Sequence, residues 1–308
     1  MNELLEISMA MKEELRVCLE EYMNDKMGGS GTKDSRFNYI YSRLLKILSD
    51  IMERLCGEFA SSDFEPCDFE LSIKRDGDVR PFTLTLEKGT VQIRGIIDRV
   101  DKMDMDGKRF IRVVDYKTGG KTFELSDVLE GLNMQMLLYL VSIWRNGKGD
   151  YENIIPAGVL YYPARTELLK SKREDSADEI LRKRYIKTKM HGLLVDDEQI
   201  IRRMDKKEEG LFLPVSFDKK TGEIKGNLIS LEALERLASK MDTIIKNMGN
   251  SLHCGNVDAR PLMGEGHTNT CEYCDYGDVC MVRKPNYRYI EKMSHDECIQ
   301  EIMKEDVK

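Results

Sequence analysis

The sequence predicts an α+β protein in which helices pack on a mixed central sheet. Two amphipathic helical stretches come first, a run of strand-like segments follows, and helical character then returns before a further strand. Helices, an antiparallel meander, a helix and another strand in this order are typical of a single sheet with helices on its faces.

The composition is that of a chain long enough to bury a hydrophobic core. Of its 308 residues 41% are hydrophobic, and no apolar run approaches the roughly 18 residues of a membrane span. The acidic N-terminus is unlike a signal peptide, and eight cysteines in such a chain indicate reduced thiols or a metal site. We therefore expect a cytoplasmic protein without a membrane partner.

The net charge of −7 argues against a nonspecific polycation on DNA, but it leaves room for a local basic groove. Residues 170–189, which are rich in Lys and Arg, are one candidate for such a groove. A solvated surface is the commoner role for a charged run of this kind.

The first 60 residues predict two helices that lead into the core. Apolar side chains recur at helical spacing over residues 2–25, and a second apolar stripe runs between residues 37 and 55. The sequence GGSG at 28–31 separates the two stretches.

Residues 61–165 predict the core that carries the candidate site. The period changes at Glu65, after which four consecutive strands are expected, separated by turns. A helix capped by Ser126 is expected over 125–147, and a strand over 154–163 ends at its proline. The four strand segments are CDFELSIKR (67–75), PFTLTLEKG (81–89), TVQIRGIIDRVDKM (90–103) and KRFIRVVDYKT (108–118).

Residues 166–262 predict an insertion followed by a hairpin and a helix that pack on the core. The stretch 166–210 is charged and poorly periodic, which indicates helix and loop. A hairpin is expected over 211–226, and a helix over 230–249 that begins at a serine cap and stops at Gly249. Residues 263–308 form a cysteine-rich segment and a tail, with a short helix near 294–304.

The candidate active site starts from two acids on neighbouring strands. Side chains two positions apart in a strand share a face, so Asp115 and Lys117 point the same way. If Asp106-Gly107 forms a two-residue hairpin turn, Asp98 lies directly opposite Asp115. Two facing carboxylates repel unless a cation lies between them, and oxygen ligands favour Mg²⁺ or Mn²⁺. The alternative for these residues is a set of ion pairs at the strand ends.

Together these side chains predict phosphodiester hydrolysis. Lys117 beside a metal could orient a water or stabilise charge on a phosphate. Gln135 interrupts an apolar helical run and Tyr139 follows on the same face, so both could point towards the metal. A buried glutamine with local hydrogen bonds is the alternative. Arg99 either contacts DNA or pairs with Asp101, and the sequence leaves both roles open.

A second candidate site lies near the C-terminus. Cys271, Cys274 and Cys280 fall within ten residues, in the order C-x-x-C-x-x-x-x-x-C. Close thiolates at this spacing bind iron–sulfur clusters or zinc. The alternative is a set of unrelated buried or surface thiols.

Three motifs resemble those of RecB-type nucleases of the PD-(D/E)XK superfamily: GIIDRVD (95–101), VVDYKTG (113–119) and GLNMQMLLYL (131–140). The resemblance implies a restriction-endonuclease-like core. It also implies a role for each candidate residue. The metal ligands would be Asp98, Asp115 and the backbone carbonyl of Tyr116, the catalytic lysine would be Lys117, and the remaining catalytic side chains would be Gln135 and Tyr139.

The cysteine array and several further segments narrow the resemblance to the C-terminal nuclease domain of the AddB family, which belongs to the AddAB helicase–nucleases. The further segments are FEPCDFELSI (64–73), PAGVLYYPA (156–164), KMHGLLVDD (189–197), LFLPVSFDKKTGEIKG (211–226) and GNVDARPL (255–262). This resemblance implies a metal-dependent DNA exonuclease in double-strand-break repair and recombination. Its partners would be an AddA-type helicase–nuclease chain and a single DNA strand delivered by a helicase. A 4Fe–4S cluster would be held by Cys271, Cys274, Cys280 and one distant cysteine.

Two family features have no counterpart in this sequence. No cysteine stands in the CPF context of the family's upstream cluster ligand, and all four histidines follow Asp115, whereas the family's histidine ligand lies on an upstream helix. We interpret the chain as a fragment with an absent or incomplete cluster and weak or absent nuclease activity. The alternatives are a stand-alone RecB-like or CRISPR-associated exonuclease and a non-catalytic DNA-binding or assembly module.

Overall fold

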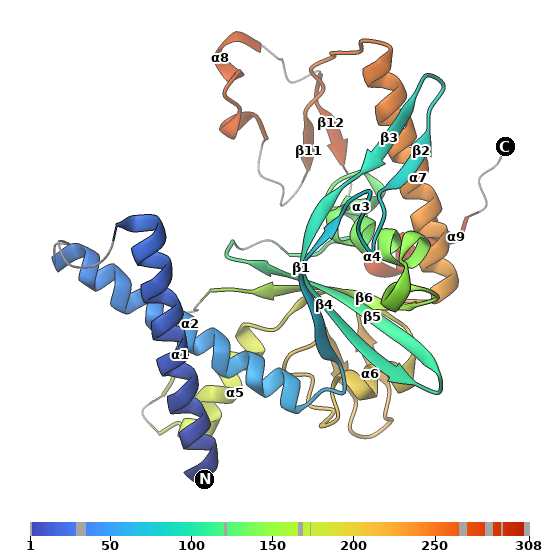
Figure 1. The fold of residues 1–308 in the computed structure, drawn as a ribbon. Coiled ribbons are helices and arrows are strands. Elements are labelled where there is room, and N and C mark those ends of the chain that lie inside the picture. The colour runs from blue at the N-terminus through green and yellow to red at the C-terminus, as the bar shows by residue number, and fades with distance from the viewer. Residues whose placement is uncertain are drawn as a thin grey trace.

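A six-stranded mixed sheet lies between two groups of helices in the computed structural model (Figure 1), which confirms the predicted α+β class. The structure describes residues 2–28, 35–119, 122–165, 169–172, 174–264, 270–280, 286–290 and 292–304. Within these ranges, every helix is too short or too polar to pass through a lipid bilayer.

Both N-terminal helices are present, as α1 (Asn2–Met27) and α2 (Ser35–Ala60), although most of the predicted break between them lies outside the described residues. The apolar stripe of α2 is only partly covered, since Ile40 and Leu44 are 52% and 41% exposed. The buried side chains of α2 are instead Arg54 and Glu58. Periodicity predicted this helix, but it did not predict that charged residues attach it to the sheet.

The sheet order is β1-β4-β5-β6-β7-β10. The pairs β1–β4, β4–β5 and β6–β7 are antiparallel, and the pairs β5–β6 and β7–β10 are parallel. The strands are β1 (Glu65–Ile73), β4 (Gly95–Met105), β5 (Lys108–Lys117), β6 (Ile155–Pro163), β7 (His191–Val195) and β10 (Leu228–Ile229).

The four expected strands exist, but the predicted meander is wrong in its pairing. β2 (Phe82–Thr85) and β3 (Thr90–Ile93) form a separate hairpin that lies along α7 (Figure 1). β1 pairs with β4 across this hairpin, with Leu71 opposite Ile97. The alternation of side chains identifies a strand, but it does not identify the strand's partner.

The single helix expected over 125–147 is two helices, α3 (Leu125–Leu129) and α4 (Gln135–Asn146). Gly131 and Asn133 lie between them in the left-handed region, with φ of +83° and +53°, and this conformation ends a helix. The N-cap of α3 is Glu124, so the prediction of Ser126 as the cap is wrong. The break places Gln135 at the first position of α4.

The stretch 166–210 holds more than the expected helix and loop. It contains α5 (Ala177–Lys187) and α6 (Glu198–Met204), and it also contributes β7 to the central sheet. β7 has five residues, of which four are buried, and so short a run carries little periodic signal. A 3₁₀ turn, η1 (Gly149–Tyr151), precedes β6.

The hairpin expected over 211–226 is confirmed as β8 (Val215–Phe217) and β9 (Ile224–Gly226). The next helix, α7 (Leu231–His253), begins at the predicted cap, because the Ser230 hydroxyl accepts a hydrogen bond from Ala233 N–H. The predicted stop at Gly249 is wrong. The helix continues through Gly249, whose missing Cβ makes room for Leu86.

The C-terminal segment ends in α9 (His295–Met303), which confirms the helix expected near 294–304. Before α9 the chain forms a two-stranded parallel sheet and two short helical turns. These elements are β11 (Leu262–Gly264), η2 (Thr270–Tyr273), α8 (Gly277–Cys280) and β12 (Arg288–Ile290).

Hydrophobic clusters cover both faces of the sheet. One cluster joins the sheet to α3, α4, α7 and α9, with Val113, Leu137 and Leu237 among its buried members. The other lies on the opposite face with α6 and the end of α2, and it includes Leu160 and Ile201. Alternate residues of β5 therefore face different clusters, so each candidate side chain is assigned to one face.

Candidate active site

The β4–β5 hairpin has the predicted register. Asp106 and Gly107 both have positive φ, +52° and +72°, as a two-residue type I′ turn requires. The paired residues run from Met105 opposite Lys108 to Arg99 opposite Val114. Asp98 and Asp115 are the next two residues in this register.

At Asp98 the backbone ladder ends and a side chain replaces it. Tyr116 N–H donates to Asp98 Oδ2 at 2.9 Å, so this carboxylate is held one residue from Asp115 in the sequence of β5. Asp98 is half-buried, and Asp115 is 5% exposed. The structure thus brings the two predicted acids to the same end of the hairpin.

Lys117 lies on the same face as Asp115, as strand geometry predicted. Its Nζ is 2.5 Å from Asp115 Oδ2 and 5.6 Å from the ring centroid of Tyr161, so the ammonium is held between a carboxylate and an aromatic face. Burial, together with the Asp115 carboxylate, raises the pKa of Tyr161 to about 12, which keeps the phenol neutral.

Sequence reasoning missed Tyr161. It stands opposite Asp115 in the parallel β5–β6 ladder, and it is buried. Parallel neighbours far apart in the chain have no short turn that fixes their register, so the sequence held no signal for this contact.

Gln135 and Tyr139 lie together beside the start of β4. Gln135 is exposed, and its Nε2 donates to Tyr139 Oη at 3.0 Å. Tyr139 is 7% exposed, and its phenol occupies the space that a side chain at Gly95 would fill. The structure therefore places this pair near Asp98, three residues after Gly95, while its role towards a metal stays a prediction.

We expect Gly95→Ala to push the Tyr139 phenol out of its place. Overpacking of this kind should lower the free energy of unfolding by about 1–3 kcal/mol, which denaturant titration measures. Gly119→Ala is the matched control, because a Cβ there meets open space and should change stability little. Equal stability of the two variants would contradict the close approach.

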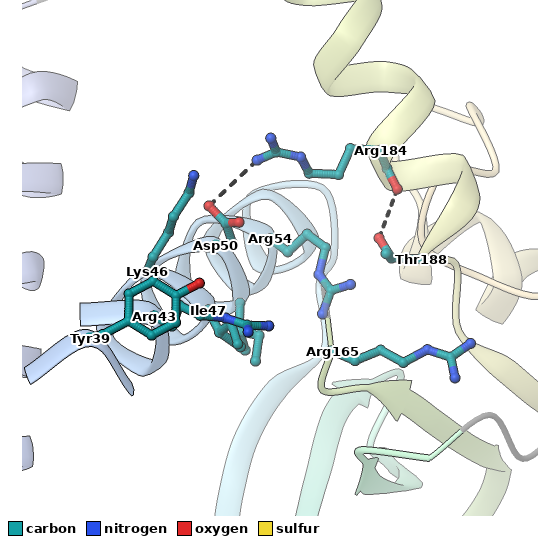
Figure 2. Close-up of a pocket in the computed structure, with 10 residues that line it drawn as sticks. Tyr39, Arg43, Lys46, Ile47, Asp50, Arg54, Arg165, Arg184 and Thr188 are labelled. Atoms are coloured by element: carbon teal, nitrogen blue, oxygen red, sulfur yellow. Dashed lines mark hydrogen bonds and ion pairs between the residues drawn. The ribbon is translucent and has the colours of Figure 1, made fainter. Parts of the chain in front are cut away.

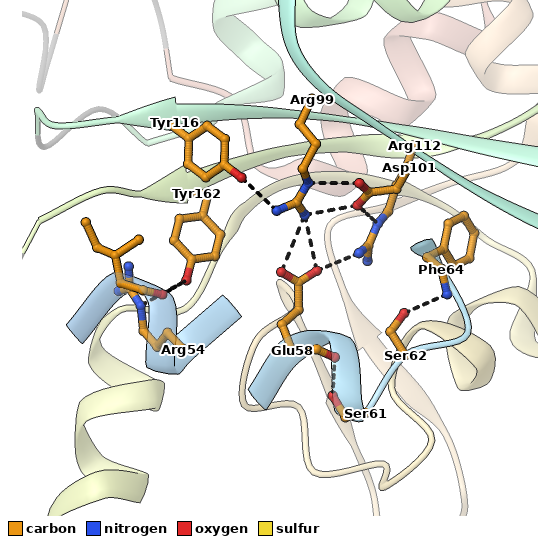
Figure 3. Close-up of polar contacts among 11 residues, drawn as sticks. Arg54, Glu58, Ser61, Ser62, Phe64, Arg99, Asp101, Arg112, Tyr116 and Tyr162 are labelled. Atoms are coloured by element: carbon orange, nitrogen blue, oxygen red, sulfur yellow. Dashed lines mark hydrogen bonds and ion pairs between the residues drawn. The ribbon is translucent and has the colours of Figure 1, made fainter. Parts of the chain in front are cut away.

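Four buried charged side chains tie α2 to the hairpin, on the face opposite Asp115 (Figure 3). They are Glu58 of α2, Arg99 and Asp101 of β4, and Arg112 of β5, and each is at most 1% exposed. Asp101 lies 2.8 Å from Arg99 Nε and 2.8 Å from Arg112 Nε. Glu58 lies 2.5 Å from Arg112 Nη2 and 3.4 Å from Arg99 Nη2.

This buried network is balanced in charge. Burial disfavours the charged guanidinium of Arg99, but Asp101 and Glu58 outweigh that effect, so the pKa of Arg99 lies above its usual value. Arg99 Nη1 also donates to Tyr116 Oη at 2.9 Å, which links the network to the residue between Asp115 and Lys117. Of the two roles left open for Arg99, the structure therefore shows the pairing with Asp101.

The three cysteines of the candidate cluster lie in successive turns. Cys271 is half-buried, Cys274 and Cys280 are exposed, and all three are free thiols. Across the described ranges, no three His, Cys, Asp or Glu side chains come together as a metal-binding group. The thiols as placed do not form the ligand set of a cluster, and the cluster stays a prediction of the family resemblance.

The oxygen donors at the hairpin suit a hard divalent cation. Mg²⁺ usually keeps several waters and takes only one or two carboxylates from the protein. Asp98 and Asp115 supply such a pair, and the carbonyl of Tyr116 follows in the chain. The residues present therefore fit the predicted Mg²⁺ or Mn²⁺.

A mixed sheet whose central antiparallel pair ends in two acids and a lysine defines a nuclease-type fold and site. The chain belongs to the PD-(D/E)XK nuclease superfamily, whose family model matches residues 3–281. The family resemblance inferred from the sequence motifs is thereby confirmed.

The chain is similar to three proteins that are each named as the B-type component of an ATP-dependent helicase/deoxyribonuclease, known as AddB. The one from Clostridium acetobutylicum is 33% identical over 93% of this chain and 25% of that protein. The one from Acetivibrio thermocellus is 32% identical over 84% of this chain and 23% of that protein. The one from Clostridium tetani is 31% identical over 94% and 26%, respectively. The chain thus spans about a quarter of the length of the curated relatives it matches.

Proposed function

We propose that this chain is the nuclease module of a helicase–nuclease and hydrolyses phosphodiester bonds of DNA with Mg²⁺ or Mn²⁺. One observation carries the proposal: the hairpin register holds Asp98 beside the end of β5, where Asp115 and Lys117 share a face. Membership of a nuclease superfamily and the names of the relatives support it.

Each site residue has a distinct role in this proposal. Asp98, Asp115 and the Tyr116 carbonyl would hold the metal ion. The ion, when bound, polarises a phosphoryl oxygen and lowers the pKa of a bound water. Lys117, restrained by the Tyr161 ring, presents an ammonium that stabilises negative charge on the phosphate.

Gln135 and Tyr139 offer an amide and a phenol to the DNA backbone at the edge of the same site. Their mutual hydrogen bond fixes the direction of both groups. In this proposal they orient the strand and take no part in proton transfer.

The setting of the module follows from the relatives. Their printed name combines an ATP-dependent helicase with a deoxyribonuclease. We therefore propose that a helicase delivers a single DNA strand to this site, that an AddA-type helicase–nuclease chain is the partner, and that the assembly repairs double-strand breaks in the cytoplasm.

The test is cleavage of a labelled single strand with Mg²⁺, with Mn²⁺ and with EDTA. We expect slow shortening of the strand with either metal and none with EDTA. The assay should use excess protein, because the family's upstream histidine has no counterpart here. Tight strand binding without cleavage in any metal would instead favour the non-catalytic binding or assembly module.

A further inference from the structure

A basic pocket of about 510 Å³ lies between α2, α5 and the residues that follow β6 (Figure 2). Cationic side chains from all three segments line it. The charged lining residues are Arg43, Lys46, Asp50, Arg54, Arg165 and Arg184. We call this the basic pocket, and part of its wall comes from the Lys/Arg-rich stretch 170–189.

Positive charge in the basic pocket exceeds negative charge. Asp50 is the one carboxylate among the described lining residues, and it already pairs with Arg184 at 3.5 Å. Arg43 and Lys46 are exposed on α2, and no ion pair joins either of them to a carboxylate in the part of the chain that the structure describes. An anion that entered the pocket would therefore meet cations that no protein acid neutralises.

Arg54 gives the clearest sign of a missing anion. It is only 4% exposed, yet its partners are neutral: Nε donates to Tyr162 Oη at 3.2 Å, and Nη2 donates to the Pro163 carbonyl at 2.5 Å. Its guanidinium also lies over the Tyr162 ring, 4.7 Å from the centroid, and points into the pocket (Figure 2). Buried charges are normally paired, and within the described residues no carboxylate pairs with Arg54.

The basic pocket and the candidate active site meet at one edge of the sheet. Pro163 stands opposite Lys117 in the β5–β6 ladder, and Ala164 N–H donates to the Lys117 carbonyl at 2.8 Å. The next residue, Arg165, lines the pocket. Tyr161 contacts Lys117 on one face and Tyr162 contacts Arg54 on the other, so the two sites lie on opposite faces of this edge.

We propose that the basic pocket binds backbone phosphates of the DNA strand whose cleaved bond lies at Asp98 and Asp115. This inference rests on the proposed function and adds a second phosphate site to it. Guanidinium groups match phosphate oxygens in geometry and charge. The volume lies within the range of about 300–1,000 Å³ for ligand sites. Tyr39, 63% exposed on the pocket wall, offers a ring on which a base can stack.

The experiment compares the double variant Arg43→Gln/Lys46→Gln with the wild-type chain. Binding of a labelled single strand of about 15 nucleotides is followed by fluorescence anisotropy in EDTA at several salt concentrations. We expect the Kd to rise roughly tenfold and the slope of log K against log salt to shrink by about 1.4, because two phosphate contacts are lost.

The control variant is Lys219→Gln/Lys220→Gln, which removes the same charge from the exposed turn between β8 and β9. It should leave both the Kd and the salt slope close to the wild-type values. An equal effect of both double variants would overturn the pocket assignment, since only net charge would then matter. A pocket that holds inorganic phosphate as tightly as the strand would also overturn it.

Measurement in EDTA separates this inference from the proposed function. A chain that binds the strand through Arg43 and Lys46 but never cleaves it would sink the proposed function alone. A chain that cleaves DNA with metal but binds it independently of these two side chains would sink the pocket alone.

Discussion

Asp115→Asn abolishes metal-dependent cleavage of DNA while the chain stays folded. We expect a loss of at least about 100-fold, because the change removes one of two carboxylates that would hold the ion and leaves the shape of the side chain nearly unchanged. Cleavage of a labelled strand by excess protein measures the rate, and Mn²⁺ binding followed by electron paramagnetic resonance measures loss of the ion directly.

Asp104→Asn is the matched control for this result. Asp104 lies on the same hairpin but is exposed, and it pairs with Arg109 at 2.8 Å. Its neutralisation should leave both cleavage and Mn²⁺ binding close to wild type. If Asp115→Asn also cleaved and bound Mn²⁺ normally, Asp115 and Lys117 would be a strand-end ion pair, the alternative that the sequence left open.

Glu58→Gln lowers the free energy of unfolding by about 3–5 kcal/mol. Glu58 is 1% exposed and balances Arg99 and Arg112, so its neutralisation leaves two buried guanidinium groups with only Asp101. Loss of one partner from a buried ion network costs this much, because the remaining charge stays out of water. Urea unfolding followed by circular dichroism measures the change.

Glu232→Gln provides the comparison at the surface. Glu232 pairs with Arg236 one turn along α7, at 3.0 Å, and its side chain is 64% exposed. Solvent screens such a pair, so a cost of no more than about 0.5 kcal/mol is expected. A similar small cost for Glu58→Gln would show that α2 is attached to the sheet by its apolar contacts and not by the network.

The network also explains how the site is held from below. Arg99 and Asp101 follow Asp98 on β4, and Tyr116, which Arg99 contacts, precedes Lys117. Charged contacts on one face of the hairpin thus fix the strands whose other face carries Asp115. A prediction centred on the acids themselves had no reason to include Glu58, which lies about forty residues earlier on a helix.

Residues near one another in the chain determined the candidate site. The turn at Asp106-Gly107 fixes the register of its own two strands, and strand alternation puts Asp115 and Lys117 on one face. Both effects act within a few residues, so the amino-acid sequence was enough to predict them. The same holds for the Ser230 cap, which needs only the N–H groups of its own helix.

Contacts between distant segments were decided by the tertiary structure alone. The pairing of β1 with β4, the place of β7 in the sheet, and the ring of Tyr161 beneath Lys117 depend on which surfaces the whole core buries together. The same is true of Gly249, which the sequence offered as a helix stop and the fold uses as space for Leu86. Local periodicity shows which side of an element is apolar, but the partner of that side is chosen by the burial energy of the assembled core.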